Sequence, residues 1–161
     1  MCGISGIVFK KNNVDNGKII TMNEILSHRG PDQSGYLEYK NILLGHVRLS
    51  VIDISDNGRQ PMSNDGRFWI IFNGEIYNYL EIKEQLLQKN YKFYSKTDTE
   101  VILNAYKEWG IKCFEKFNGD WVIAILDKKK NTFIIARDQI GSKPCYIYED
   151  ECKIAFSSEI K

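Results

Sequence analysis

The second residue of the chain is a cysteine, followed directly by Gly3-Ile4-Ser5-Gly6. If Met1 is removed, Cys2 carries a thiol and a free α-amine on one residue, so that a nucleophile has its own base. The thiol has a reference pKa of about 8.5 and the α-amine one of about 8, so the neutral amine can accept the thiol proton near neutral pH. The side chain at position 2 is small, and we expect Met1 to be trimmed. Cys2 is therefore predicted to be an N-terminal nucleophile.

Four further polar segments interrupt the apolar pattern at predicted strand ends or helix starts. They are 28–32, 48–50, 73–78 and 97–100. Loops held by a rigid sheet commonly present catalytic groups. Arg48 lies in an otherwise apolar stretch, which favours an acidic partner or ligand. Asn73-Gly74 is also a common tight-turn dipeptide, and Asp98 suits a helix N-terminus, so both have a structural interpretation of their own.

The elements that must position these residues are predicted from apolar periodicity. Strands are expected where β-branched and aromatic residues gather, at Ile4–Phe9, Gly35–Tyr39, Ile42–Asp53, Phe68–Phe72, Trp121–Leu126, Thr132–Ala136, Tyr146–Tyr148 and Lys153–Phe156. Helices are expected at Ile19–Leu26, Tyr79–Asn90 and from Thr99 to Gly110, the last with the capping-box pair Thr97 and Glu100.

The pattern of strands and helices predicts an α+β fold. Trp121–Leu126 and Thr132–Ala136 are nearly continuous apolar runs, which indicates strands buried on both faces. Such strands need a second sheet on one side and helices on the other. We predict a four-layer αββα sandwich of two stacked, mainly antiparallel sheets. A length of 161 residues without repeats or a Pro/Gly/Ser linker predicts one domain over residues 1–161.

Composition excludes several classes of function. With 22 basic and 21 acidic residues the net charge is +1, which gives no reason to expect nucleic acid or a membrane as partner. No secretion signal or apolar stretch of roughly 18 residues is visible. The cysteines, Cys2, Cys113, Cys145 and Cys152, lack metal-type spacing, and Cys113 and Cys145 have apolar neighbours typical of a core. We predict a cytoplasmic protein without disulfides or a metal site.

As a set, the polar segments resemble the glutamine-hydrolysing domain of class II amidotransferases, in particular its asparagine synthetase branch. The later segments 137–144 and 157–161 extend the resemblance over essentially the whole chain. Residues 48–53, Arg-Leu-Ser-Val-Ile-Asp, are similar to the asparagine synthetase form, whereas the sugar-phosphate branch typically carries Arg-Trp-Ala-Thr-His-Gly. The resemblance implies the N-terminal nucleophile hydrolase type of the predicted sandwich, and hydrolysis of L-glutamine to glutamate and ammonia.

The resemblance also implies a role for individual residues. Cys2 would attack the side-chain amide of glutamine and form a thioester, while the Asn73 amide and the Gly74 backbone N–H would stabilise the oxyanion. Substrate binding would fall to Arg48, Leu49, Val51, Ile52, Glu75 and Asp98. Among these, the planar fork of Arg48 suits an α-carboxylate, and the carboxylates of Asp98 and Glu75 suit an α-ammonium. Direct catalysis by His28 is not expected.

Members of this branch join the glutaminase to a second domain that activates aspartate with ATP. No Gly-rich phosphate loop of the Ser-Gly-Gly-Leu-Asp-Ser kind occurs here, so we expect the synthetase domain to be absent from this chain. ATP and Mg²⁺ are expected only in that domain, and no cofactor is expected for glutamine hydrolysis. The expected partner is the synthetase part, in the parent chain or in a separate subunit, which would receive the ammonia.

Two alternatives remain open from the residues alone. The chain could be a free-standing amidotransferase subunit that serves a different acceptor, which a stable heteromer on co-purification would favour. It could also be a catalytically silent, glutamine-binding regulatory module that keeps the fold. Retention of Met1 would favour the silent module, because the nitrogen of Cys2 would then be an amide without basicity.

Overall fold

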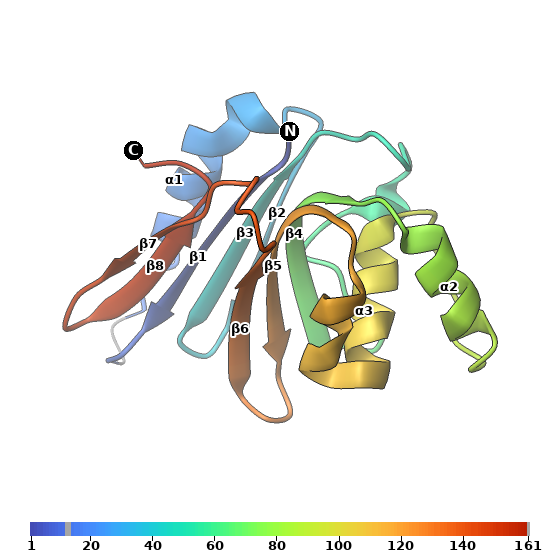
Figure 1. Ribbon diagram of the computed structural model, residues 1–161. Helices are drawn as coiled ribbons and strands as arrows, with labels where there is room; N and C mark the ends of the chain where they lie inside the picture. Colours follow the sequence, from blue (N-terminus) through green and yellow to red (C-terminus); the bar gives the residue numbers. More distant parts are fainter. Residues whose placement is uncertain (12–13, 161) are drawn as a thin grey trace.

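The computed structural model describes residues 1–11 and 14–160 and contains two stacked sheets with helices on their outer faces (Figure 1). One sheet has the strand order β2-β3-β1-β8-β7 and the other the order β4-β5-β6. The strands are β1 (Gly3–Phe9), β2 (Gln33–Tyr39), β3 (Ile42–Arg48), β4 (Phe68–Ile76), β5 (Gly119–Asp127), β6 (Thr132–Arg137), β7 (Tyr146–Glu149) and β8 (Lys153–Ser157). The helices are α1 (Gly17–Leu26), α2 (Tyr79–Leu87) and α3 (Asp98–Trp109), with short 3-10 turns η1 (Ser27–Arg29), η2 (Asp56–Gly58) and η3 (Gly110–Lys116).

Three apolar clusters hold the four layers together. Between the two sheets lie Ile4, Leu44, Ile71 and Val122 with their neighbours. Because side chains alternate along a strand, Ile70 and Phe72 point to the other face of β4 and pack with α2 and α3. A third cluster around Ile19 and Leu43 joins α1 to the five-stranded sheet. The predicted αββα sandwich is confirmed, and all strand pairs are antiparallel.

The first strand lies in the middle of its sheet. β1 pairs with β3 on one side, with Gly3 opposite Val47, and with β8 on the other, with Ser5 opposite Ser157. The start of β1 and the end of β8 consequently lie at the same end of the five-stranded sheet (Figure 1). This register brings the residue before β1, Cys2, to the rim at which β3 ends in Arg48.

Two predicted strand ends were wrong. The strand expected over 42–53 ends at Arg48, and residues 49–55 form a loop instead. The strand predicted over Phe68–Phe72 does not stop before Asn73-Gly74: this dipeptide lies inside β4, with Asn73 opposite Val122 and Gly74 opposite Trp121. Gly74 has a φ of +153°, and a Cβ there would collide with the carbonyl oxygen of Asp120. Pairing with β5 therefore overrides the local turn preference of this dipeptide.

Burial also departs from the sequence prediction in β6. The central strand β5 is buried along most of its length, as predicted, whereas β6 is half-buried because it forms the edge of its sheet. Cys113 is fully buried, as predicted, and Cys145 is half-buried. All four cysteines are free thiols. Among the described residues, no helix has the length and apolar character needed to cross a membrane.

Only one of the two hydrogen bonds of the predicted capping box forms at the start of α3. The hydroxyl of Thr97 accepts a hydrogen bond from the N–H of Glu100 at 3.3 Å. The Glu100 carboxylate turns instead to the preceding loop, where it accepts from the N–H groups of Tyr94 and Ser95. These bonds fix the residues that lead into Asp98, the first residue of the helix.

Packing between the sheets should dominate stability. We predict that Ile71→Ala lowers the free energy of unfolding by about 2–5 kcal/mol, because it leaves a cavity where the side chain is fully buried. Ile140→Ala is the control, since Ile140 is 90% exposed and its loss should change stability by less than about 0.5 kcal/mol. Urea denaturation measures both, and equal losses would contradict the assignment of the core.

Candidate active site

All the predicted site residues line one cavity of about 220 Å³ at the rim of the sandwich. They come from the residue before β1, the end of β3 with its following loop, the end of β4 and the start of α3. The predicted members are Cys2, Arg48, Leu49, Val51, Ile52, Asn73, Gly74, Glu75 and Asp98. The cavity is smaller than the roughly 300–1,000 Å³ typical of sites for drug-sized ligands, and therefore suits a single amino acid.

Cys2 is half-buried, and its thiol donates a weak hydrogen bond to the carbonyl of Leu49 at 3.6 Å. Burial raises the pKa of the Cys2 thiol above its ordinary value. The positive charges of the amino terminus and Arg48 oppose this shift in pKa without cancelling it. The thiol is consequently protonated near neutral pH, and a reaction that uses the thiolate needs a nearby base.

Asn73 presents a buried amide to the cavity. The residue is 1% exposed, and among the described residues its Nδ2 has no hydrogen-bond partner. A buried donor without a partner costs about 1–3 kcal/mol, and such groups are rare in folded proteins. Gly74 follows in β4 and lines the same cavity. A ligand oxygen beside Asn73 would satisfy the amide, as an oxyanion hole requires.

Arg48 places a positive charge at one side of the cavity. Its guanidinium donates to the side-chain oxygen of Gln33 at 2.8 Å, to the carbonyl of Ser55 at 2.9 Å and to the carbonyl of Asp53. These partners orient the guanidinium, but their oxygens belong to neutral groups. Arg48 is only 5% exposed, so its charge is also poorly hydrated. An anionic ligand would stabilise it more than these neutral partners do.

Asp98 places a carboxylate in the same cavity. It is 5% exposed and accepts a hydrogen bond from the N–H of Ile76 at 3.1 Å. Burial raises the pKa of Asp98 to about 6, and the charge of Glu75 acts in the same direction, against the lowering effect of the Ile76 bond. Glu75 is exposed and lines the cavity beside it. A cationic group bound here would stabilise the ionised form of Asp98.

Leu49, Val51 and Ile52 are exposed residues of the loop between β3 and η2 and line the cavity. The loop is held at both ends: Asp32 accepts from the N–H of Ser50 at 2.7 Å, and Asp53 accepts from the N–H of Lys96 at 2.9 Å. Hydrogen bonds from Ser55 and Lys96 lower the pKa of Asp53 to about 2. The loop is therefore preorganised by hydrogen bonds to the carboxyl groups of Asp32 and Asp53.

Two buried polar residues that the sequence analysis missed support the floor of the site. Gln60 accepts from the N–H of Phe72 at 2.7 Å and donates to the hydroxyl of Thr99 at 3.1 Å. His46 bridges the sheets, since its Nε2 lies 3.1 Å from the carbonyl of Phe72. Burial lowers the pKa of His46 to about 4, so the ring is neutral and Nε2–H donates.

These contacts fix the residue that precedes Asn73. A histidine inside the apolar stretch 42–48 is a signal that could have been noticed, whereas nothing local distinguishes Gln60 or Gln33. Lys143, from the segment between β6 and β7, also lines the cavity and was not predicted there.

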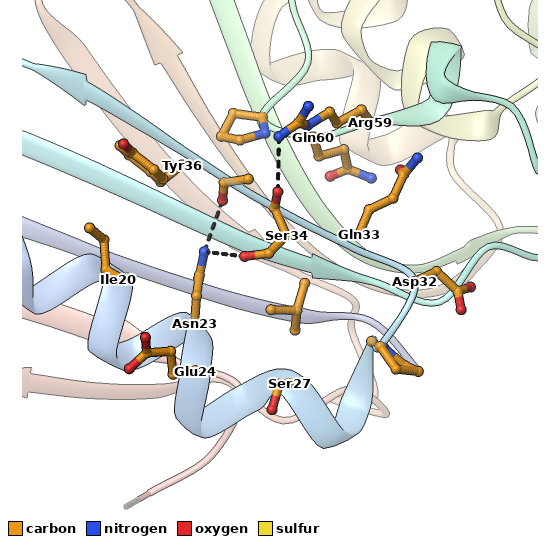
Figure 2. Close-up of a pocket in the computed structure, with 15 residues that line it drawn as sticks. Ile20, Asn23, Glu24, Ser27, Asp32, Gln33, Ser34, Tyr36, Arg59 and Gln60 are labelled. Atoms are coloured by element: carbon orange, nitrogen blue, oxygen red, sulfur yellow. Dashed lines mark hydrogen bonds between the residues drawn. The ribbon is translucent and has the colours of Figure 1, made fainter.

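A second cavity of about 690 Å³ lies between α1 and the segment 59–61 (Figure 2). Asn23 bridges the floor of this cavity, since its amide donates to the Ser34 hydroxyl and to the carbonyl of Gly35. Although larger, this cavity contains no cysteine or histidine and none of the predicted site residues. It therefore lacks the thiol and the other groups expected of the predicted site. Among the described residues, no cluster of three potential metal ligands occurs in either place.

The sandwich of two antiparallel sheets between helices is a fold found in solved amidotransferases. The solved structure of glutamine phosphoribosylpyrophosphate amidotransferase from B. subtilis shares it, with a TM-score of 0.81 at 20% identity, over 98% of this chain and 42% of that one. A family model described as a glutamine amidotransferase domain matches residues 1–161. The chain belongs to this glutamine amidotransferase family.

Within the family, similar proteins are of the asparagine synthetase type. Glutamine-hydrolysing asparagine synthetases 3 and 1 of Bacillus subtilis are 40% identical over 166 residues and 41% identical over 167 residues. Each alignment covers 100% of this chain but only 27% and 26% of those proteins. The chain thus spans about a quarter of the length of these two relatives.

The buried histidine should make stability depend on pH. The folded-state pKa of His46 lies below the unfolded value of about 6.5, so its stabilising contribution is complete above pH 6.5 and is lost as the pH falls towards 4. We predict that lowering the pH from 7 to 4.5 destabilises the wild type by about 2–3 kcal/mol more than it destabilises His46→Gln. Urea denaturation at both pH values measures this. Parallel curves would mean that His46 titrates alike in both states.

Proposed function

We propose that this chain is the glutamine-hydrolysing domain of an asparagine synthetase-type enzyme. It converts L-glutamine to glutamate and ammonia through a thioester on Cys2, and the ammonia serves an ATP-dependent amidation of aspartate. The observation that carries the proposal is the composition of the 220 Å³ cavity. It is lined by a thiol, a buried arginine, a buried carboxylate and a buried amide donor that has no partner in the part of the chain that the structure describes.

The charges of the cavity suit an amino acid in its zwitterionic form. Arg48 can donate a planar pair of hydrogen bonds to an α-carboxylate, and Asp98 with Glu75 can accept from an α-ammonium. With both ends of the α-carbon bound, the side chain of glutamine is directed towards the remaining wall. Cys2 and Asn73 line the same cavity and supply a thiol and an amide donor.

The first half of the reaction is acyl transfer to sulfur. After removal of Met1, the neutral α-amine of Cys2 takes the thiol proton, and the sulfur attacks the side-chain carbonyl carbon of glutamine. The carbonyl oxygen becomes an oxyanion that accepts hydrogen bonds from the Asn73 amide and the Gly74 N–H. The C–N bond then breaks, the α-ammonium returns its proton to the departing nitrogen, and ammonia leaves a γ-glutamyl thioester.

The second half is hydrolysis of that thioester. The α-amine, now neutral again, accepts a proton from water, whose oxygen attacks the same carbonyl carbon. The oxyanion reforms in the same hole, the C–S bond breaks, and the proton returns to sulfur. Glutamate is released and the thiol is restored. The same amine accepts and returns the proton in both halves of the reaction. The proposed glutaminase reaction therefore uses no metal or cofactor.

The remaining parts of the proposal concern the protein as a whole. We propose a single glutaminase domain over residues 1–161, with the ATP- and Mg²⁺-dependent synthetase part carried by another domain or subunit. The short coverage of the relatives supports this division. A cytoplasmic location is proposed with it, which suits four free thiols, two of them half-buried and one exposed.

The nucleophile can be tested by covalent labelling. We predict that 6-diazo-5-oxo-norleucine, a glutamine analogue with an electrophilic side chain, labels Cys2 in the Met1-trimmed chain and that Cys2→Ala lowers glutamine hydrolysis by more than about 1,000-fold. Peptide mass spectrometry locates the label, and glutamate release gives the rate. Cys152→Ala, which removes the exposed thiol, is the matched control and should keep both properties.

An N-terminally extended form that retains Met1 should hydrolyse no glutamine, because its Cys2 nitrogen is an amide. Glutamine turnover by Cys2→Ala, or a label on Cys113 or Cys145, would contradict the assignment. Binding of glutamine without turnover by the trimmed wild type would favour the silent module.

Recognition of the α-ammonium should depend on pH. With its pKa raised to about 6, Asp98 is ionised at pH 7.5 and mostly protonated at pH 5. We predict that the Kd of glutamine, measured by calorimetry on the Cys2→Ala variant, rises by about tenfold for each pH unit below 6. The same variant with Asp98→Asn should bind weakly and with a flat profile from pH 5 to pH 8. A sloping profile after Asp98→Asn would show that another group titrates in the site.

A further inference from the structure

Arg29, in the turn η1 directly after α1, contacts the backbone of the nucleophile. Its Nε donates a hydrogen bond to the carbonyl oxygen of Cys2 at 3.0 Å. Its Nη1 donates to the carboxylate of Glu159 at 2.9 Å. The Arg29 side chain is 9% exposed, and among the described residues its Nη2 has no hydrogen-bond partner. Two contacts therefore hold this guanidinium, one on the nucleophile and one on the C-terminal segment.

The C-terminal segment holds the first strand a second time through Ser158. The hydroxyl of Ser158 accepts from the N–H of Ile4 at 3.0 Å, and the Ser158 N–H donates to the carbonyl of Ile4 at 3.0 Å. Ser158 is fully buried, so these bonds are protected from water. Ser158 thus binds the first strand directly at Ile4, and Glu159 contacts it indirectly, through Arg29, at Cys2. Figure 1 shows this segment at the end of the sheet where the chain begins.

The contacts of Arg29 and Ser158 affect the position of the Cys2 thiol and nitrogen because the β ladder ends before Cys2. The first residue paired with β3 is Gly3, so Cys2 lies beyond the ladder. Its carbonyl is one of the few atoms by which the protein can fix the rotation of a residue that carries both nucleophile and base. The guanidinium of Arg29 supplies that fixed point, and Glu159 orients the guanidinium. His28 contacts the same carboxylate at 3.0 Å but is largely exposed.

We propose that Arg29 is a positioning residue for Cys2 and that Glu159 and Ser158 of the C-terminal segment anchor it, so that the conformation of residues 158–159 sets the geometry of the nucleophile. This proposal rests on the proposed function of Cys2. It gives the segments 28–32 and 157–160 a role in the reaction rate, although none of their residues lines the cavity. A small misplacement of a reacting group can cost about 100-fold in rate, whereas substrate binding by Arg48 and Asp98 is left intact.

The test compares Arg29→Ala, Arg29→Lys and Glu159→Gln in the Met1-trimmed chain. For Arg29→Ala we expect the kcat of glutamine hydrolysis to fall by about 100-fold while KM stays within about threefold, with partial recovery on adding guanidinium at non-denaturing concentration. Arg29→Lys can still pair with Glu159 but has no Nε–H to place on the Cys2 carbonyl. It should therefore keep wild-type thermal stability and still show the low kcat.

Arg67→Ala is the matched control. Arg67 forms a charged pair with Asp127 at 2.7 Å in the other sheet and lines no part of the cavity, so its loss should lower stability without changing kcat. For Glu159→Gln, a smaller fall in kcat at unchanged KM is expected. Wild-type kcat in folded Arg29→Ala, or full recovery of kcat in Arg29→Lys, would overturn the proposal. If Arg29→Ala does not fold, the lysine and Glu159 variants decide.

A second readout does not depend on glutamine. The rate of Cys2 alkylation by iodoacetamide, measured from pH 5 to pH 10, should follow a shifted profile in Arg29→Lys, because the thiol loses its fixed relation to the α-amine. A wild type that hydrolyses no glutamine defeats the proposed function, and the alkylation profiles then still decide the role of Arg29. Superimposable profiles for wild type and Arg29→Lys would refute it.

Discussion

The position of the first strand is the constraint on which the site depends. β1 lies between β3 and β8 and is hydrogen-bonded on both sides, so the chain begins in the middle of a sheet. The ends of most chains are poorly ordered, and a terminal nucleophile would be of little use in a mobile end. Here the residue before the strand lies where β3 ends in Arg48, and the loop that follows β3 supplies the carbonyl beside the thiol.

The second sheet delivers the other half of the site. Asn73 and Gly74 lie within a paired strand rather than on a loop, so the proposed oxyanion donors have the rigidity of the β4–β5 ladder. His46 and Gln60 tie the preceding residue, Phe72, to the first sheet and to α3 through hydrogen bonds that water cannot reach. The Asn73 amide, which has no partner within residues 1–11 and 14–160, and the buried charges of Arg48 and Asp98 reduce stability at the same place. Such local costs are characteristic of functional sites, since ligand binding offsets them.

Much of this architecture could be predicted from the sequence because it follows from periodicity. The β-branched and aromatic run of β4 and the helical spacing of α3 are patterns carried by neighbouring residues, so they can be recognised locally. The predictions that were wrong concern features set by contacts between residues far apart in the sequence. The end of β3 at Arg48 depends on hydrogen bonds from Arg48 to the loop it opens, and Asn73-Gly74 extends β4 only because β5 lies beside it. β6 has the composition of a central strand but forms an edge.

The same distinction applies to the site. Its predicted residues were recognised from ordered motifs, and the fold does bring them to one cavity. The residues that support them, Gln33, Gln60 and His46, act through single long-range contacts that leave no pattern in the sequence. The hydrogen bond from Arg29 to Glu159 joins residues 130 positions apart in the sequence. The pairing of β1 with β8 brings these two residues together.

The environments of the titratable groups also bear on which group acts as the base. Near neutral pH the thiol is protonated, so some neighbour must accept its proton. His46 is too weak a base, with a pKa of about 4, and its Nε2–H is already donated to the Phe72 carbonyl. Asp98, with a pKa of about 6, would lose the charge that attracts an ammonium if it took the proton. Arg48 cannot accept one. In the proposed function, the base is the α-amine that removal of Met1 would expose on Cys2, the same residue that carries the thiol.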